Sequence, residues 1–261
     1  MRRPPPTPPD REHEAGPRPH RLPRPFVGTI HDVLPSTSDT AKALAAGGAA
    51  HGTTVCALRQ TAGRGRLGRS WTSPPGNLHA SFVLRYDVAP ARQAELGFAA
   101  ALAAADLVDH HLAGGAGARL KWPNDVLVGE AKIAGILLEA DAAQAAPWLV
   151  LGIGVNLRHV PPDLPYAAAS VASLGAVPPE PEAALHQLAA ALGTWLAVWE
   201  SEGFAPLRAA WLRRGPAPGT PLRITRGDTT RHGEFLDLAA DGALMLWTPD
   251  GTLRITTGMV S

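Results

Sequence analysis

A glycine-rich stretch, Gly63-Arg-Gly65-Arg-Leu-Gly68, constrains the fold of this chain more than any other segment. It follows an apolar run and matches the G-x-G-x-x-G pattern with which dinucleotide-binding domains open a helix beneath a pyrophosphate. Two prolines and a further glycine follow before residue 77, so there is no room for that helix. No acidic residue ends a second strand about 20 residues later, as ribose recognition would require. The sequence therefore predicts a long functional loop over residues 61–77 instead of a dinucleotide fold.

Three arginines give this loop its chemistry. Arg64, Arg66 and Arg69 place forked donors on a glycine-rich backbone that can approach a ligand closely. Such a loop suits a polyphosphate or a carboxylate. Taken alone, the motif also fits a solvated basic loop.

The remaining pattern alternates helices with short strands. Ser36-Thr37-Ser38 precedes residues 39–46, and Gly47-Gly48 follows, which predicts a capped helix. Strands are expected over 53–60, 78–86, 120–122, 126–128, 133–139 and 148–156, and helices over 95–112, 182–200 and 206–214. From residue 220 short strands alternate with Asp-Gly turns. We expect a mixed α/β (α+β) body over 26–215 and a small all-β module over 216–261.

Composition limits the location and partners of the chain. Its 261 residues are 45% hydrophobic, enough for a sizeable core, and no apolar stretch reaches membrane-spanning length. The single cysteine, Cys56, allows no intrachain disulfide and is interpreted as a core residue in a reducing compartment. The N-terminus lacks the apolar segment of a secretory signal. These features predict a cytoplasmic protein with no membrane partner.

Residues 1–25 differ from the body in composition. They hold nine prolines and six arginines against three acidic residues, a net charge of +3, whereas the rest of the chain carries −2. A slightly acidic body argues against DNA as a partner, because phosphate contacts need a basic surface. We expect a disordered tail with no recognition helix. A polyproline ligand for an adaptor groove is the alternative.

Lysine and asparagine are rare and lie near the motifs. The chain has three lysines against 21 arginines, and three asparagines. They are Lys42, Lys121, Lys132, Asn77, Asn124 and Asn156. A lysine retained against this bias is expected to use its compact charge, which a guanidinium cannot supply. Chance retention of solvated lysines is the competing explanation.

Five ordered motifs together resemble biotin protein ligase, over about residues 28–160. They are Ser36-Thr37, Gln60-Thr-Ala-Gly-Arg-Gly-Arg66 with Trp71, Lys121-Trp-Pro-Asn-Asp125, Lys132-Ile-Ala-Gly-Ile-Leu-Leu-Glu139 and Gly152-Ile-Gly-Val-Asn156. The resemblance implies a class II aminoacyl-tRNA synthetase-like catalytic domain, with a mixed or antiparallel sheet, and a small SH3-like β-barrel at residues 216–261. Residues 1–25 are too few and too rich in proline for the helix-turn-helix domain of many relatives, which indicates the monofunctional type.

The resemblance also implies a two-step reaction. Biotin reacts with ATP, in the presence of Mg²⁺, to give biotinyl-5′-AMP, and biotin then passes to a lysine of a biotin carboxyl carrier protein. Adenylation brings two anions together, so the site needs fixed positive charge. An uncharged ureido ring needs neutral donors and acceptors instead.

Site residues follow from the matched motifs. The implied catalytic residues are Lys132, Arg64 and Arg66. Implied biotin contacts are Ser36, Thr37, Ser38, Gln60, Gly63, Arg64, Gly65, Arg66, Ser81, Lys132 and Gly135. Implied ATP and adenylate contacts are Arg64, Arg66, Arg69, Trp71, Asn124, Lys132 and Asn156. Asp125 would position the carrier lysine, and Mg²⁺ would be held by the ATP phosphates instead of by protein ligands.

Two positions depart from the family pattern. Ser38 stands where relatives often have asparagine, and His79 stands where an aromatic side chain commonly flanks the biotin pocket. A lipoate ligase or octanoyl transferase is the nearest rival function, and a catalytically silent biotin-binding protein is a second. The sequence leaves the identity of the carrier and the oligomeric state open, a homodimer included.

Overall fold

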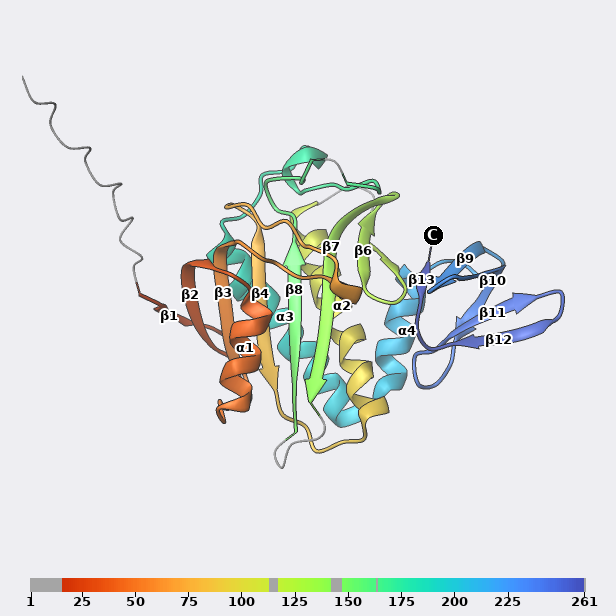
Figure 1. Ribbon diagram of the computed structural model, residues 1–261, viewed down its shortest axis with the longest axis horizontal. Coiled ribbons are helices and arrows are strands. Elements are labelled where there is room, and N and C mark those ends of the chain that lie inside the picture. The colour runs from red at the N-terminus through yellow and green to blue at the C-terminus, as the bar shows by residue number, and fades with distance from the viewer. Residues whose placement is uncertain (1–15, 113–116, 142–146, 163, 261) are drawn as a thin grey trace, which may run out of the picture.

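The computed structural model describes residues 16–112, 117–141, 147–162 and 164–260, which form a mixed α/β body and a smaller β module (Figure 1). The strands of the body are β1 (Arg18–Arg21), β2 (Val27–Leu34), β3 (Thr53–Gln60), β4 (Leu78–Leu84), β5 (Arg119–Lys121), β6 (Asp125–Val128), β7 (Ala131–Asp141) and β8 (Trp148–Val155). The helices are α1 (Thr37–Ala46), α2 (Pro90–His111), α3 (Pro181–Glu202) and α4 (Phe204–Arg214), with short 3₁₀ turns at Arg66–Gly68 and Ala172–Leu174. The module contains β9 (Pro221–Arg226), β10 (Thr229–Leu238), β11 (Leu244–Thr248), β12 (Gly251–Ile255) and β13 (Met259–Val260).

The eight strands of the body form one sheet in the order β1-β2-β3-β4-β8-β7-β6-β5. Only β2 and β3 run parallel, joined through α1, and every other neighbouring pair is antiparallel. The module forms a separate antiparallel sheet in the order β12-β11-β10-β9-β13.

The two faces of the large sheet are covered by different helices. Val55, Val83 and Val150 pack with Ala41 and Ala45 of α1 in a small apolar cluster. The residues that alternate with them on the same strands belong to the main core, which includes residues of α2 and α3; they are Cys56, Phe82, Leu84, Leu149 and Leu151. Figure 1 shows α1 in front of the sheet and α2 and α3 behind it.

The β module is joined to the body by buried contacts. The Nε1–H of Trp122 donates a 3.1 Å hydrogen bond to the carbonyl of Gly242. The ring of Trp211 on α4 lies 6.4 Å from that of Phe235 on β10, and both side chains are fully buried. The chain passes from body to module through residues 215–220, where the sequence predicts the domain boundary.

The predicted elements agree closely with those observed, except near the N-terminus. Ser36 caps α1, since its Oγ accepts a hydrogen bond from the backbone N–H of Asp39. The disorder predicted for residues 1–25 is wrong for Arg18–Arg21, which forms edge strand β1, while residues 1–15 lie outside the described residues. Antiparallel pairing with β2 holds this segment, and an Arg18–Asp32 ion pair adds to it, so an apolar pattern was not needed.

Burial settles the interpretation of Cys56. Its side chain is fully buried, and burial raises the pKa of the thiol to about 12. The thiol therefore stays protonated and acts as a small core residue, as predicted. No helix in the described ranges is long and apolar enough to cross a membrane.

Asn77 has a structural role at the start of β4. Its Oδ1 accepts hydrogen bonds from the backbone N–H groups of Leu157, Arg158 and His159 at 3.1, 2.9 and 2.9 Å. Its Nδ2 donates to the carbonyl of His159 at 2.8 Å. One buried amide thus ties β4 to the chain leaving β8, which explains why a rare asparagine lies here.

Replacing Asn77 by alanine is expected to destabilise the protein by about 3 kcal/mol or more, because buried N–H groups lose their acceptor. Urea unfolding of the purified protein would measure this loss. The Asn77→Asp variant keeps the acceptor oxygens and should lose less. A loss below about 0.5 kcal/mol for Asn77→Ala would contradict the assignment.

Candidate active site

Three glycines open a cavity on the face of the sheet that α1 covers. Beyond Val150 the same face of β8 continues with Gly152 and Gly154, and Gly135 of β7 pairs with Gly154. A Cβ at Gly152 would lie 2.6 Å from the Ser38 Oγ, and one at Gly154 would lie 2.6 Å from the Trp71 ring. Side chains therefore rest directly on bare backbone at this glycine floor (Gly135, Gly152 and Gly154). The cavity above it has a volume of about 740 Å³.

A cluster of neutral polar groups forms one end of the cavity. The backbone N–H and hydroxyl of Thr37 donate to Gln60 Oε1 at 2.7 and 3.1 Å. The Ser81 hydroxyl lies 2.8 Å from that of Thr37 and 3.1 Å from that of Ser38. Thr37, Ser38 and Gln60 line the cavity, whereas Ser81 is buried beneath them and Ser36 acts as the helix cap.

Lys132 lies on the glycine floor within reach of several groups. Its Nζ is 2.6 Å from Asp125 Oδ1, and it lies 5.4 Å from the ring centroid of Trp71 and 5.5 Å from that of Tyr166. A Cβ at Gly135 would come within 3.3 Å of this Nζ. The absent side chain at Gly135 therefore makes room for the ammonium.

Arg66 is held in the cavity wall by an amide. Its Nη1 donates to Asn124 Oδ1 at 3.0 Å, and Asn124 Nδ2 donates to the carbonyl of Ile136 at 2.9 Å. Burial lowers the pKa of Arg66, while the Asp125 carboxylate raises it and Arg69 lowers it further. A guanidinium keeps its charge through such shifts, so Arg66 presents a fixed cation to the cavity.

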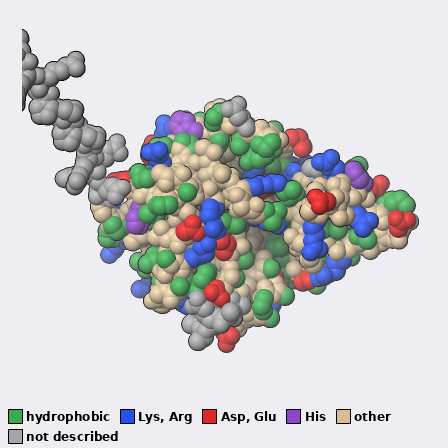
Figure 2. Space-filling view, viewed as in Figure 1, with side chains coloured by type: hydrophobic (Ala, Val, Ile, Leu, Met, Phe, Trp, Pro, Cys, Tyr) green, Lys and Arg blue, Asp and Glu red, His purple; other side chains and the backbone are tan. Residues whose placement is uncertain are grey.

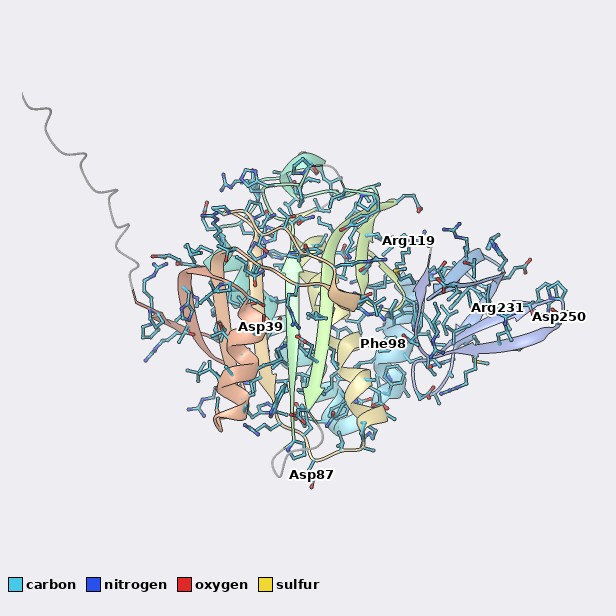
Figure 3. The ribbon with its side chains drawn as sticks, in the orientation of Figure 1. Asp39, Asp87, Phe98, Arg119, Arg231 and Asp250 are labelled. Carbon is cyan, nitrogen blue, oxygen red and sulfur yellow. The ribbon has the colours of Figure 1, made fainter. Side chains whose placement is uncertain are left out.

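Arg64 lies at the rim of the cavity in a four-charge cluster with Asp39, Lys42 and Glu139. It pairs with Asp39 at 3.3 Å and with Glu139, and the Lys42 Nζ lies 2.9 Å from each of these carboxylates. Burial alone would lower the pKa of Lys42, but its hydrogen bonds to Glu139 and Asp39 raise it. Figure 2 shows basic and acidic side chains side by side on this face, and Figure 3 labels Asp39 beside the centre of the sheet. The loop over 61–77 is thereby tied to α1 and β7.

Two residues of the predicted site, Gly63 and Asn156, have contacts within the protein itself. A Cβ at Gly63 would lie 2.3 Å from the carbonyl oxygen of Trp71, so this glycine serves the fold of the loop itself. Asn156 is buried and does not line the cavity, and its Nδ2 donates to the carbonyl of Ala169. Asn156 thus supports the connection after β8, and its predicted adenylate contact stays a prediction. Gly65, Arg69 and Trp71 line the cavity as expected.

Several lining residues were missed by the sequence analysis. Tyr166 comes from the connection between β8 and α3, and Arg223, Thr225, Met259 and Val260 come from the β module. The Arg69 guanidinium contacts the sulfur of Met259. No local pattern marks these residues, since only the packing of the connection and the docking of the module bring them to the cavity. The glycines at 152 and 154 could have been found, because both lie in a matched motif.

The comparisons with known proteins agree with this geometry. Residues 30–156 match the Biotin/lipoate A/B protein ligase family. A biotin--[acetyl-CoA-carboxylase] ligase of Paracoccus denitrificans is 41% identical over 76% of this chain and 85% of its own length. The chain belongs to the biotin protein ligase family.

Solved structures of biotin protein ligases share the fold. That of Aquifex aeolicus in complex with biotin and ATP gives a TM-score of 0.76 at 24% identity, covering 90% of this chain and 97% of its own. That of Leishmania major in complex with biotinyl-5-AMP gives 0.60 at 25% identity, covering 87% and 98%. The predicted fold class, a class II synthetase-like catalytic domain with a C-terminal β domain, is confirmed.

His79 distinguishes this biotin protein ligase from the pattern expected of its relatives. It is 1% exposed, lines the cavity and pairs in register with Gly154. Its Nε2 lies 3.4 Å from the carbonyl of Pro74. Burial lowers the pKa of His79 to about 4, and the hydrogen bond to Pro74 opposes this only in part. The imidazole is therefore neutral near pH 7, so the cavity holds an uncharged ring where an aromatic residue was expected.

The neutral His79 should make stability depend on pH. The unfolded chain takes up a proton near pH 6.5 but the folded one only near pH 4. Above pH 6.5 the ring is neutral in both states, and the free energy of unfolding has its highest value with respect to this residue. As the pH drops from 6.5 to 4, the free energy of unfolding falls by on the order of 3 kcal/mol because of this residue. Urea unfolding across this range should show a weaker dependence for His79→Asn than for wild type. Identical pH profiles would show that His79 is not buried as a neutral ring.

The contact of Trp71 with Gly154 should hold the arginine loop in place. A methyl group in Gly154→Ala would overlap the indole, so we expect trypsin to cut after loop arginines at least about fivefold faster. Gly97→Ala is the matched control, because its nearest neighbour would be 3.9 Å away. Equal cleavage rates in both variants would show that Trp71 does not anchor the loop.

Proposed function

We propose that this chain activates biotin with ATP to biotinyl-5′-AMP and transfers biotin to a specific lysine of a biotin carboxyl carrier protein. The observation that carries the proposal is the place of Lys132, on bare backbone between a neutral polar cluster and an arginine loop. The name of the Paracoccus relative supports the reaction, and the ligands named for the Aquifex and Leishmania structures support its substrates.

The neutral end of the cavity suits the ring of biotin. Thr37, Ser38 and Gln60 offer hydroxyl and amide groups without net charge, at positions fixed by their mutual hydrogen bonds. A ureido group, which has donors and an acceptor but no charge, matches such a lining. The bare backbone of Gly152 lets the Ser38 hydroxyl lie close to the sheet, within this neutral lining.

Adenylation would take place where the two charged regions meet. A carboxylate oxygen of biotin attacks the α-phosphorus of ATP, a new P–O bond forms, and pyrophosphate leaves. Lys132 and Arg66 supply fixed positive charge for the oxygens that gain charge in this step. Arg69, Trp71 and Asn124 are proposed to hold the adenylate, because they line the cavity beside these cations.

The second step needs the amine of the carrier lysine next to the carbonyl carbon of biotinyl-5′-AMP. The carrier lysine attacks the carbonyl of the mixed anhydride, an amide forms, and AMP leaves. Asp125 is proposed to position that lysine, because its carboxylate lies at the cavity wall and already forms an ion pair with the Lys132 ammonium at 2.6 Å. Deprotonated amine is the nucleophile, so Asp125 can accept its proton or hydrogen-bond to it.

Mg²⁺ is proposed to enter with the triphosphate. Among the described residues no three His, Cys, Asp or Glu side chains are grouped to hold a metal ion.

The remaining partners are also proposals. The net charge of −2 outside residues 1–25 supports a ligase that does not bind DNA, and the single buried Cys56 supports the cytoplasm as its location. Homodimer formation remains a hypothesis, which analytical ultracentrifugation of the purified protein would test.

Transfer is tested with an acceptor domain. Incubation of the protein with biotin, Mg-ATP and a biotin carboxyl carrier domain should add one biotin to one lysine, detected by mass spectrometry. An acceptor whose lysine is replaced by arginine is the control. Labelling by lipoate in preference to biotin would reject the proposal.

Lys132 is the most direct residue to vary. Lys132→Ala should slow formation of biotinyl-5′-AMP about 10²–10³-fold with an unchanged unfolding transition, because one charge aimed at a developing anion is lost. Lys132→Arg should not restore the rate, since a planar guanidinium does not fit above Gly135. Near-normal turnover by Lys132→Arg would show that positive charge alone suffices.

A further inference from the structure

Tyr166 is a cavity residue that none of the family motifs includes. It lies on the connection between β8 and α3, and its ring centroid is 5.5 Å from the Lys132 Nζ. Trp71 lies at 5.4 Å from the same atom. Both distances are within the roughly 6 Å over which an aromatic face attracts a cation. The ammonium is therefore within reach of two aromatic rings from segments far apart in sequence.

The backbone beside Tyr166 is bonded to Lys132 itself. The N–H of Lys132 donates to the carbonyl of Ala167 at 2.8 Å, and the N–H of Ala169 donates to the carbonyl of Lys132 at 2.9 Å. These two bonds pair the connection with β7 at the lysine. The backbone next to Tyr166 is thus held against the main chain of the residue whose charge the ring attracts.

An aromatic face and a carboxylate hold an ammonium differently. Lys132 carries three N–H groups, and its Nζ forms an ion pair with the Asp125 carboxylate at 2.6 Å. A ring attracts the charge as a whole and is not a directional acceptor like an oxygen. Two rings can therefore restrict the position of Nζ while leaving N–H groups for oxygens of a substrate.

The attraction comes from the ring face and not from an ion pair. Burial raises the pKa of Tyr166, the Asp125 carboxylate raises it further, and Arg69 opposes this. The phenol is therefore neutral at physiological pH. Phenylalanine would keep this interaction, and leucine would remove it while preserving much of the bulk.

We propose that Tyr166 is a positioning residue for Lys132, an inference that rests on the proposed adenylation reaction. With Trp71 it holds the ammonium above the glycine floor, where its remaining N–H groups face the oxygens that gain charge as the carboxylate attacks the α-phosphate. Tyr166 acts through Lys132, so its loss should slow the chemical step without weakening the binding of either substrate.

The composition of the chain offers a test that does not depend on activity. Lysine labelled with ¹³C at Cε gives only three side-chain signals, from Lys42, Lys121 and Lys132, and Lys132→Arg identifies the last. Ring currents should shift the Lys132 methylene signal upfield in wild type and Tyr166→Phe, and this shift should shrink in Tyr166→Leu. A signal that does not move in Tyr166→Leu would overturn the contact, whether or not the protein is active.

Kinetics test the consequence for the reaction. Tyr166→Leu should lower kcat for biotin-dependent pyrophosphate release about 2- to 30-fold, with KM for biotin and ATP unchanged, whereas Tyr166→Phe should stay within about twofold of wild type. Val177→Ala, an 87% exposed position on the same connection, is the matched control.

The other outcomes discriminate between explanations. A raised KM for ATP with intact kcat would overturn the proposal in favour of a contact with the nucleotide base. Tyr166→Phe as slow as Tyr166→Leu would overturn it in favour of the hydroxyl. Wild type without biotin-dependent pyrophosphate release would reject the proposed function, and the lysine signals would still decide the contact of Tyr166 with Lys132.

Discussion

The absence of side chains at Gly135, Gly152 and Gly154 is the constraint on which the rest of the site depends. The face of the sheet that packs on α1 is apolar at Val83 and Val150, and farther along it changes to bare backbone. A Cβ at Gly152 or Gly154 would overlap Ser38 or Trp71, and one at Gly135 would be in tight contact with Trp71 and Lys132. One continuous sheet thus supports a helix at one end and leaves space for a ligand at the other.

Charge is distributed in two groups above this floor. Inside the cavity, Lys132 pairs with Asp125 and Arg66 bonds to the neutral Asn124. At the rim, Arg64 and Lys42 share the carboxylates of Asp39 and Glu139. An anion that binds Arg64 or Lys132 must compete with these carboxylates, whereas the hydrogen-bond partner of Arg66 is neutral.

Much of this arrangement could be predicted from the sequence, because it depends on local pattern. The cap at Ser36, the strand over 53–60 and the loop over 61–77 follow from hydroxyl, apolar and glycine or proline residues close together in the chain. Arg64 could be recognised as an anion-binding residue, but its partner Glu139 lies 75 residues away, and only the packing of β7 against α1 brings them together. Strands β1 and β2 were missed because polar residues and a proline interrupt them, and pairing between their backbones stabilises them instead.

The same distinction explains the two ends of the cavity. Motif residues line it where β7, β8 and the arginine loop meet, and each of these segments carries one of the matched motifs. Tyr166 and the residues of β9 and β13 reach it only through tertiary packing, which no local spacing records. The residues of the glycine floor can thus be predicted from the sequence. The residues of the cavity walls cannot, because they depend on the docking of other segments.

One measurement tests the central claim, that the glycine floor and its cations form an adenylating site for biotin. The purified chain is incubated with ATP, Mg²⁺ and labelled pyrophosphate, with biotin, lipoate or no acid, and label entering ATP is followed. The account predicts exchange that requires biotin and is lost in Lys132→Ala. Exchange without biotin, or with lipoate in its place, would contradict it.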